Sequence, residues 1–140
     1  MIYYFNIKTK GQTRRKKNMK YYTKEHQWVK LDGDDAIVGI TGFAAHELGD
    51  ISYVELPREG SDVIVGDSLG IVESVTESSN VYSPVSGTVI QINHNLDDDP
   101  GIINRSPEEK GWICKLENID LAEFDDLLEE EDYKKYLNTL

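Results

Sequence analysis

Short apolar runs alternate with turn-forming residues along most of this chain, and this alternation limits the possible folds more than any other feature. The first two runs, "WVKL" and "AIVGIT", flank Asp32-Gly33-Asp34-Asp35. Asp-Gly between two such runs is a strong signal for a β-hairpin, because both residues accept the positive φ of a tight turn. The sequence therefore predicts antiparallel strands joined by short turns.

The same pattern continues after one short helix. Thr41 or Gly42 is suited to cap a helix over about residues 43–48, and Gly49 is suited to end it. Proline, glycine and polar residues bound the later apolar runs, and "DDDPG" is predicted to be a loop. The runs are "ISYVEL", "DVIV", "SLGIVESV", "VYSPV", "TVIQIN" and "GWICKLE". Together they predict a mainly β domain, a small β-sandwich or flattened barrel.

Near the C-terminus the apolar period changes from that of a strand to that of a helix. Leu121, Phe124 and Leu128 recur at helical spacing. Asp120 and Glu123 have the spacing of an Asp-x-x-Glu capping box, which satisfies backbone N–H groups at a helix start. We therefore expect a C-terminal helix from about Leu121, with its narrow apolar face on the sheet.

The charge differs between residues 1–18 and the rest of the chain. Six of the 15 Lys and Arg residues, and none of the 26 acidic residues, lie in residues 1–18, so residues 19–140 carry a formal charge of −17. Such a surface repels nucleic acids and anionic membranes and suits a basic protein face. Charge kept for solubility explains it equally well. No apolar run has membrane-spanning length, so we expect a soluble protein, monomeric by default.

The basic segment 1–18 shows no apolar periodicity. A targeting peptide is one interpretation, although the segment is poor in Ser and Ala. The other, which we favour, is an upstream extension with Met19 as the working start. In either case we expect a disordered leader that is dispensable for folding, and one folded unit at residues 19–140. We expect a cytoplasmic protein, or a mitochondrial one if the leader is a targeting peptide.

Few residues have the spacing of a catalytic or metal site. Cys114 lies in a strand-like run, which favours a buried hydrophobe over a reactive nucleophile. His26, His46 and His94 are scattered without paired spacing, so no metal site is predicted. The sequence contains no phosphate-binding glycine loop and no nucleophile with a base beside it. It therefore does not favour an enzyme.

The stretch from Gly70 to Gly87, "GIVESVTESSNVYSPVSG", places a polar centre between two apolar runs and predicts two strands joined by an exposed turn. From about Met19 to Leu137 the chain resembles the H protein of the glycine cleavage system. The resemblance rests on "EHQWV", "VGITGFAAHELGDISYVELP", "VGDSLGIVESV", "VYSPVSGTVIQIN", "NLDDDPGIIN" and "GWICKL", in this order.

This resemblance implies a lipoyl-type β-sandwich, related to biotinyl carrier domains, with a C-terminal helix. It implies a non-catalytic carrier with a lipoyl group, amide-linked to a lysine at a hairpin tip. The arm takes the aminomethyl group of glycine from the decarboxylase, presents it to the aminomethyltransferase and is reoxidised by dihydrolipoamide dehydrogenase. Lipoamide is a group carrier whose chemistry belongs to the cofactor, so the protein's task is presentation to these three partners.

The position directly after "ESV", where the family pattern has its lysine, is Thr76 in this chain. No lysine occurs from Leu31 to Glu109. Arginine stays protonated and does not take the place of an acylated amine. We therefore expect no lipoyl group on this chain.

The residues around the tip leave two interpretations open. Glu73, Ser74 and Val75 precede the tip as in the family, where they shape the strand or aid recognition by the attaching enzyme. Glu77 and Ser78 stand where the family favours small apolar residues. The chain is thus a natural, non-lipoylated H-like paralogue acting as a binding or regulatory module, or an ordinary H protein with an introduced change at its tip. Several differences together favour divergence.

Overall fold

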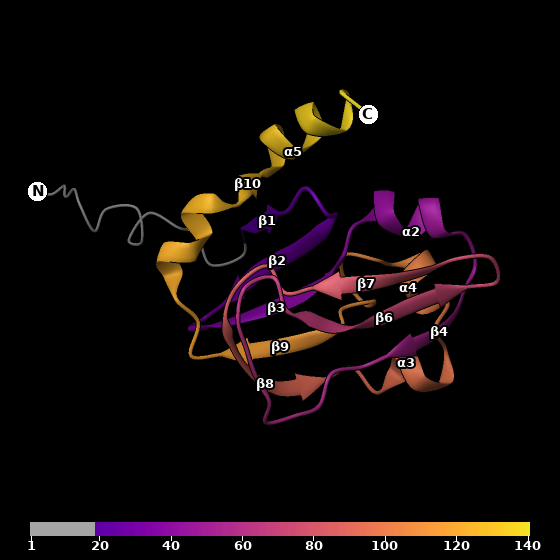
Figure 1. Cartoon of the computed structure of the whole chain (residues 1–140), viewed down its shortest axis with the longest axis horizontal. Helices are drawn as coiled ribbons and strands as arrows, with labels where there is room; N and C mark the ends of the chain where they lie inside the picture. Colours follow the sequence, from indigo (N-terminus) through magenta and orange to yellow (C-terminus); the bar gives the residue numbers. More distant parts are fainter. Residues whose placement is uncertain (1–18) are drawn as a thin grey trace, which may run out of the picture.

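Two β-sheets share one main hydrophobic core in this computed structural model, which describes residues 19–140 (Figure 1). The expectations for residues 1–18 lie outside the described residues. Within residues 19–140, no helix is long and apolar enough to cross a membrane. The predicted mainly β sandwich is confirmed.

The larger sheet has seven antiparallel strands in the order β10-β1-β2-β3-β9-β8-β5. The predicted first hairpin is confirmed, because β2 and β3 pair up to Asp32↔Asp35 and Gly33 takes φ 64° in the turn. The strands are β1 (Lys20–Tyr22), β2 (Gln27–Asp32), β3 (Asp35–Ile40), β5 (Asp62–Val63), β8 (Gly87–Ile92), β9 (Cys114–Glu117) and β10 (Leu128–Glu129).

The smaller sheet has three strands, β4 (Ile51–Glu55), β6 (Ser68–Ser74) and β7 (Ser78–Tyr82), in the order β4-β6-β7. Val54, Val72 and Val81 are buried on its inner face and join the main core. Ile64 and Val65, by contrast, lie outside any strand and are exposed, so the predicted strand "DVIV" is only two residues long.

Helices cap the ends of the sandwich. The predicted short helix is α2 (Gly42–Leu48), which begins after Thr41 and ends at Gly49. The prediction of a plain loop around "DDDPG" is wrong, because α3 (Asn95–Asp98) ends within it and α4 (Ile102–Arg105) follows it. Helices of four residues carry no apolar period. They are instead fixed by single buried anchors, Leu96 and Ile103.

The prediction that the C-terminal helix begins at about Leu121 is also wrong. Residues 121–126 form the 3₁₀ helix η1 (Leu121–Asp126), β10 follows, and the α-helix α5 (Glu130–Leu137) begins only at Glu130. Phe124 packs edge-on against Tyr21, with ring centroids 5.2 Å apart, and β10 pairs with β1. These long-range contacts outweigh the local helical pattern.

The capping box predicted at the same place is only half formed. The Asp120 side chain accepts a hydrogen bond from the Ala122 N–H at 3.0 Å and so caps η1. The Glu123 carboxylate instead accepts from the backbone N–H and hydroxyl of Ser86, at 2.7 and 2.8 Å. Glu123 therefore joins the C-terminal segment to the start of β8.

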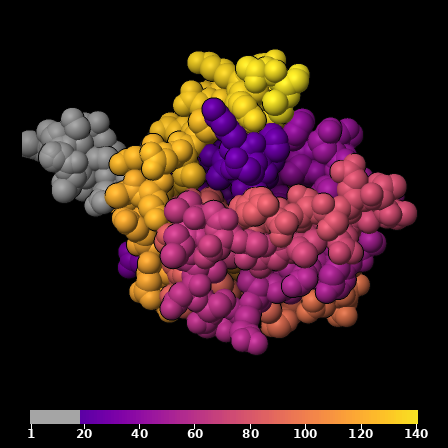
Figure 2. Space-filling model, viewed as in Figure 1, coloured from indigo at the N-terminus to yellow at the C-terminus, as the bar shows by residue number. Residues whose placement is uncertain are grey.

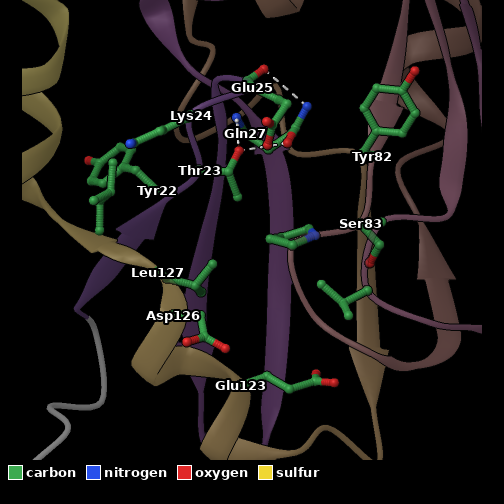
Figure 3. Close-up of a pocket in the computed structure, with 14 residues that line it drawn as sticks. Tyr22, Thr23, Lys24, Glu25, Gln27, Tyr82, Ser83, Glu123, Asp126 and Leu127 are labelled. Atoms are coloured by element: carbon green, nitrogen blue, oxygen red, sulfur yellow. Dashed lines mark hydrogen bonds between the residues drawn. The ribbon is translucent and has the colours of Figure 1, made fainter.

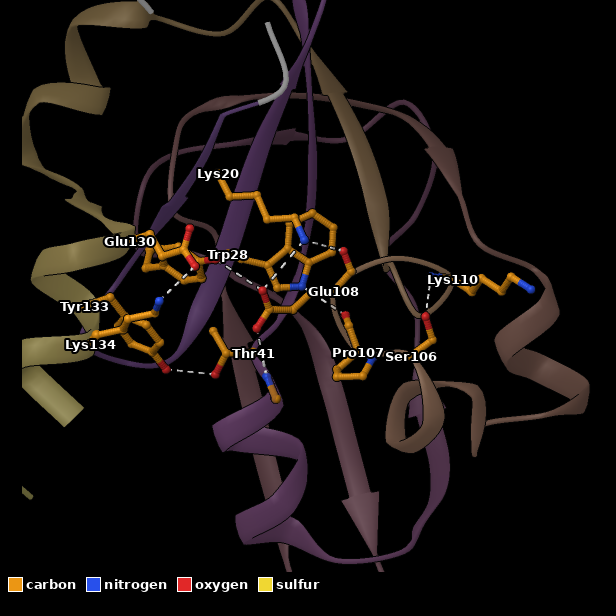
Figure 4. A network of polar contacts seen from close by, with 12 residues as sticks. Lys20, Trp28, Thr41, Ser106, Pro107, Glu108, Lys110, Glu130, Tyr133 and Lys134 are labelled. Carbon is orange, nitrogen blue, oxygen red and sulfur yellow. Dashed lines mark hydrogen bonds and ion pairs between the residues drawn. The ribbon is translucent and has the colours of Figure 1, made fainter. Parts of the chain in front are cut away.

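A polar network around Glu108 fixes β1 against α2 (Figure 4). One carboxylate oxygen of Glu108 accepts from the Tyr22 hydroxyl at 3.2 Å, and the other accepts from the Gly42 N–H at 3.1 Å. The Lys20 ammonium donates to the Glu108 carbonyl at 2.8 Å and lies 5.3 Å from the centre of the Trp28 ring. The network positions the surface on which α5 lies.

Candidate functional site

The most prominent feature of the surface is the turn between β6 and β7, which projects from the sandwich (Figures 1 and 2). The two strands pair up to Glu73↔Ser78. The Ser74 N–H donates to the Glu77 carbonyl at 2.8 Å, and the Glu77 N–H donates to Ser74 Oγ at 3.1 Å. These reciprocal bonds close a tight turn whose two central residues are Val75 and Thr76.

The side chains of this turn face solvent. Val75 is 86% exposed, and Thr76, Glu77 and Ser78 are exposed as well. Glu73 and Ser74, the last two residues of β6, are half-buried. An apolar side chain held in water contributes nothing to the core, so the fold is not what requires Val75 at this place.

The strands beneath the turn hold it rigidly. A Cβ atom at Gly70 would lie 2.0 Å from the carbonyl oxygen of Glu55, so only glycine allows β4 and β6 to approach this closely. Val72, two residues after Gly70 on β6, is completely buried. The turn is thus an exposed tip on a fixed support, which is the arrangement needed to present one side chain to other proteins.

A second feature is a hollow of about 340 Å³ at the other end of β7 (Figure 3). Four segments distant in sequence line it: the β1–β2 turn, the loop before β6, the end of β7 and the η1–β10 segment. Tyr82 on its wall is separated from Ser78 by the length of β7, roughly 13 Å at about 3.3 Å per residue. No local sequence pattern indicates this hollow, because no single segment forms it.

Several polar groups that line the hollow form hydrogen bonds with one another. The Thr23 hydroxyl donates to the buried Gln27 side chain at 2.7 Å, and Gln27 donates to the Glu25 carbonyl at 3.1 Å. Glu25 and Asp126 also line the hollow, from opposite sides in Figure 3. With aromatic and aliphatic walls, such a hollow suits an apolar group that ends in a hydrogen-bond donor or a cation.

The residues considered as nucleophiles or ligands lie elsewhere. Cys114 is completely buried on β9, and burial raises the pKa of its thiol to about 12, so it stays protonated. The prediction of a buried hydrophobe is confirmed. His26, His46 and His94 lie in the β1–β2 turn, on α2 and before α3, respectively.

A small, rigid two-sheet sandwich that holds out one exposed turn defines the lipoyl-type carrier class. A family model described as "Glycine cleavage H-protein" matches residues 20–140. The crystal structure of a glycine cleavage system H protein from Mycobacterium marinum superimposes with a TM-score of 0.77 at 32% identity, covering 88% of this chain and 98% of that one.

Two relatives show the same similarity in sequence. A protein of Schizosaccharomyces pombe, whose name describes a candidate mitochondrial glycine cleavage system H protein, is 52% identical over 117 residues, 84% of this chain and 69% of that protein. Glycine cleavage system H protein 4 of Aquifex aeolicus is 48% identical over 124 residues, 89% of this chain and 72% of that protein. The chain belongs to the glycine cleavage H-protein family, whose members are carriers rather than catalysts.

Proposed function

We propose that this chain binds the partners of the glycine cleavage system as an H-family module without a lipoyl group. The observation that carries the proposal is Thr76 at the centre of the exposed turn, where the family pattern has a lysine. A lipoyl amide needs a primary amine. The strands and turn from Ser68 to Tyr82 offer hydroxyls, carboxylates and the Asn80 amide, but no amine. These residues do not fit the group.

None of the lysines in residues 19–140 lies on the hairpin from Ser68 to Tyr82. Lys24 lines the hollow at the far end of β7, but its ammonium lies 5.4 Å from the centre of the Tyr136 ring. Lys30 and Lys115 lie on β2 and β9 of the other sheet. The hairpin turn of the family is present in this chain, but the amine that would carry the lipoyl group is absent. This combination favours binding to partners over transfer of the aminomethyl group.

The partners proposed are the decarboxylase, the aminomethyltransferase and dihydrolipoamide dehydrogenase. A chain that occupies their docking sites without an arm would compete with a lysine-bearing H protein. The formal charge of −17 on residues 19–140 suits a basic docking face. We also propose a monomeric state and a cytoplasmic location. The relatives do not decide the location, since one is named as mitochondrial and others are bacterial.

The test of modification is intact-mass spectrometry after co-expression with a lipoate ligase and lipoate. We expect no lipoyl mass on the native chain, and none on Thr76→Arg, which adds a long cation without an acylable amine. Thr76→Lys tests whether the rest of the tip is still recognised by the ligase. If this variant is lipoylated, the side chain at position 76 alone separates a lipoylated from a non-lipoylated chain. If the native chain gains the lipoyl mass, the proposal is wrong.

The test of binding is the glycine exchange assay, reconstituted with a lipoylated H protein and increasing amounts of this chain. We expect inhibition that more lipoylated H protein relieves, because both proteins compete for the same surfaces. Glu73→Lys reverses a charge beside the tip and should weaken this inhibition, because the acidic surface is proposed to meet a basic docking face. Absence of inhibition by a folded chain contradicts the binding module.

A further inference from the structure

Helix α5 lies over the start of the larger sheet, where Tyr133 is its buried side chain and Tyr136 and Leu137 pack beside it. Tyr133 is only 5% exposed. Its ring stacks on the ring of Tyr22, with centroids 4.6 Å apart and an interplanar angle of 5°. Figure 2 shows the C-terminal segment, in yellow, against the first strands, in indigo. Lifting α5 would expose the face of Tyr22.

The hydroxyl of Tyr133 continues a chain of hydrogen bonds that starts at α2 (Figure 4). The Ala44 N–H donates to Thr41 Oγ1 at 3.2 Å. Thr41 Oγ1 is 2.9 Å from the Tyr133 hydroxyl oxygen, which is 2.8 Å from Nδ1 of His26. The chain therefore joins three separate elements: the cap of α2, the helix α5, and the turn between β1 and β2.

The protonation of His26 decides the direction of this chain. Each hydroxyl has one hydrogen, and a backbone N–H can only donate. With an unprotonated Nδ1, Ala44 donates to Thr41, Thr41 donates to Tyr133, and Tyr133 donates to His26. Every donor then has one acceptor, so these contacts favour a neutral His26 with its hydrogen on Nε2.

A second proton on His26 reverses the chain and leaves one group without a partner. Nδ1–H becomes a donor to Tyr133, whose hydrogen must then point to Thr41. Thr41 Oγ1 already accepts from Ala44, and in residues 19–140 its hydroxyl makes no further hydrogen bond. Thr41 is 1% exposed, so its hydrogen would be buried without an acceptor, which is strongly unfavourable.

We propose that α5 is a proton-sensitive cover: protonation of His26 breaks the hydrogen-bond chain through Tyr133 and lifts α5 from the sheet. The surface uncovered includes the rings of Tyr22 and Phe43, an aromatic patch that the closed protein hides or half-hides. The inference rests on this chain of contacts and does not depend on the proposed function of the hairpin tip.

The surroundings of His26 favour its neutral form in the closed state. Burial lowers the pKa of His26 below the ordinary value, and the carboxylates of Glu25 in the same turn and Glu47 on α2 oppose this shift. Phe43 packs on the imidazole at 4.5 Å between ring centroids. The Tyr136 ring, with the Lys24 ammonium on it, lies 6.0 Å away.

The direction of the pKa shift fixes the pH window. Because the pKa is lowered when α5 is closed, the open state binds the proton more readily. The contribution of His26 to closure is therefore complete above its ordinary pKa of about 6.5 and is lost as the pH falls below that value. The cover is closed at neutral pH, and acidification raises the fraction of time that it is open.

The experiment is hydrogen exchange of the α5 amides in the full chain, corrected for the intrinsic pH dependence of exchange. Between about pH 7.5 and about pH 5.5 we expect the fraction of time that α5 is open to rise about tenfold, the effect of one buried unpaired hydroxyl. The β2 and β3 amides should keep their protection. Equal protection of α5 at both pH values overturns the proposal.

Two variants and a control identify the group responsible. His26→Asn removes the titratable ring, and asparagine tolerates the positive φ of 70° at this position, so the opening of α5 should be the same at both pH values. Tyr133→Phe keeps the stacked ring and removes the hydroxyl, so α5 should be looser and should respond to pH less than in the native chain, because only the burial of His26 then opposes its protonation. His46→Asn, in an exposed histidine on α2, should respond like the native chain. A pH response that persists in His26→Asn, stays undiminished in Tyr133→Phe, or disappears in His46→Asn contradicts the mechanism.

Discussion

The hairpin tip and the C-terminal arm, residues 121–137, are both at the edge of the sandwich, and they depend on the rest of the chain to opposite degrees. The tip residues make their hydrogen bonds to one another, through Ser74 and Glu77. The arm is held by distant contacts: Phe124 on Tyr21, Glu123 on Ser86, and Tyr133 on Tyr22.

This difference separates chemistry from stability. The residue that decides whether the hairpin can be acylated, Thr76, lies where the core does not constrain it. A substitution there changes function without unfolding the protein, since exposed positions outside special contacts tolerate change. In the arm, by contrast, each buried side chain both shapes the surface and stabilises it. The predictions below test this contrast.

The largest difference should appear between Tyr133→Ala and Thr76→Ala. Removing the buried Tyr133 ring should lower the free energy of unfolding by about 3 kcal/mol, as for other buried aromatic side chains. Thr76→Ala should change it by less than about 0.5 kcal/mol. Urea denaturation of both variants measures the two values. Effects of equal size would show that the tip and the arm do not differ as described.

The support of the tip should be far more sensitive than the tip itself. Gly70→Ala places a methyl group against the Glu55 carbonyl and should cost about 2 kcal/mol through overpacking. Gly42→Ala is the matched control, because its nearest atom, in Pro107, is at the ordinary distance of 3.8 Å. That control should stay within about 0.5 kcal/mol of the native chain. A neutral Gly70→Ala would mean that β4 and β6 are not in rigid contact.

The bond between Glu123 and Ser86 should contribute a smaller amount. Glu123→Gln keeps the shape and removes the charge from two hydrogen bonds, so a loss of about 1 kcal/mol is expected. Combining it with Ser86→Ala in a double-mutant cycle isolates the interaction. Asp126→Asn, on the rim of the same hollow, is the control and should show no coupling with Ser86→Ala. If the effects of Glu123→Gln and Ser86→Ala on the free energy of unfolding are additive, the two side chains do not stabilise the fold through this interaction.

The same contrast explains which features could be predicted from sequence. Strands and the hairpin turn follow from patterns within a few residues, so β2, β3, β6 and the exposed tip were predicted at nearly their observed positions. The strand predicted at "VYSPV" is displaced, because β7 runs from Ser78 to Tyr82. The helix α2 was predicted because its cap, Thr41, is a local signal.

The features that were missed depend on residues far apart in the chain. The spacing of Leu121, Phe124 and Leu128 is helical, but Phe124 packs on Tyr21 and Leu128 pairs with Tyr22 on β1. These contacts convert one expected helix into η1, β10 and α5. The hollow beside Tyr82 and the chain of bonds through Tyr133 are likewise built from several segments, and no local pattern indicates either.

The smallest effect expected is that of Thr76→Lys on stability. The new side chain would enter solvent beside Glu73 and Glu77, where an exposed ion pair contributes little. The free energy of unfolding should therefore stay within about 0.5 kcal/mol of the native value. Thr76→Arg, which adds the same charge without an acylable amine, should behave alike in denaturation and differ only in the lipoylation assay. A loss above about 1 kcal/mol in both variants would mean that the tip contributes to the fold, and that Thr76 is retained for stability. If both are neutral, the acceptor chemistry of this hairpin can change through one exposed side chain while the sandwich that presents it stays the same.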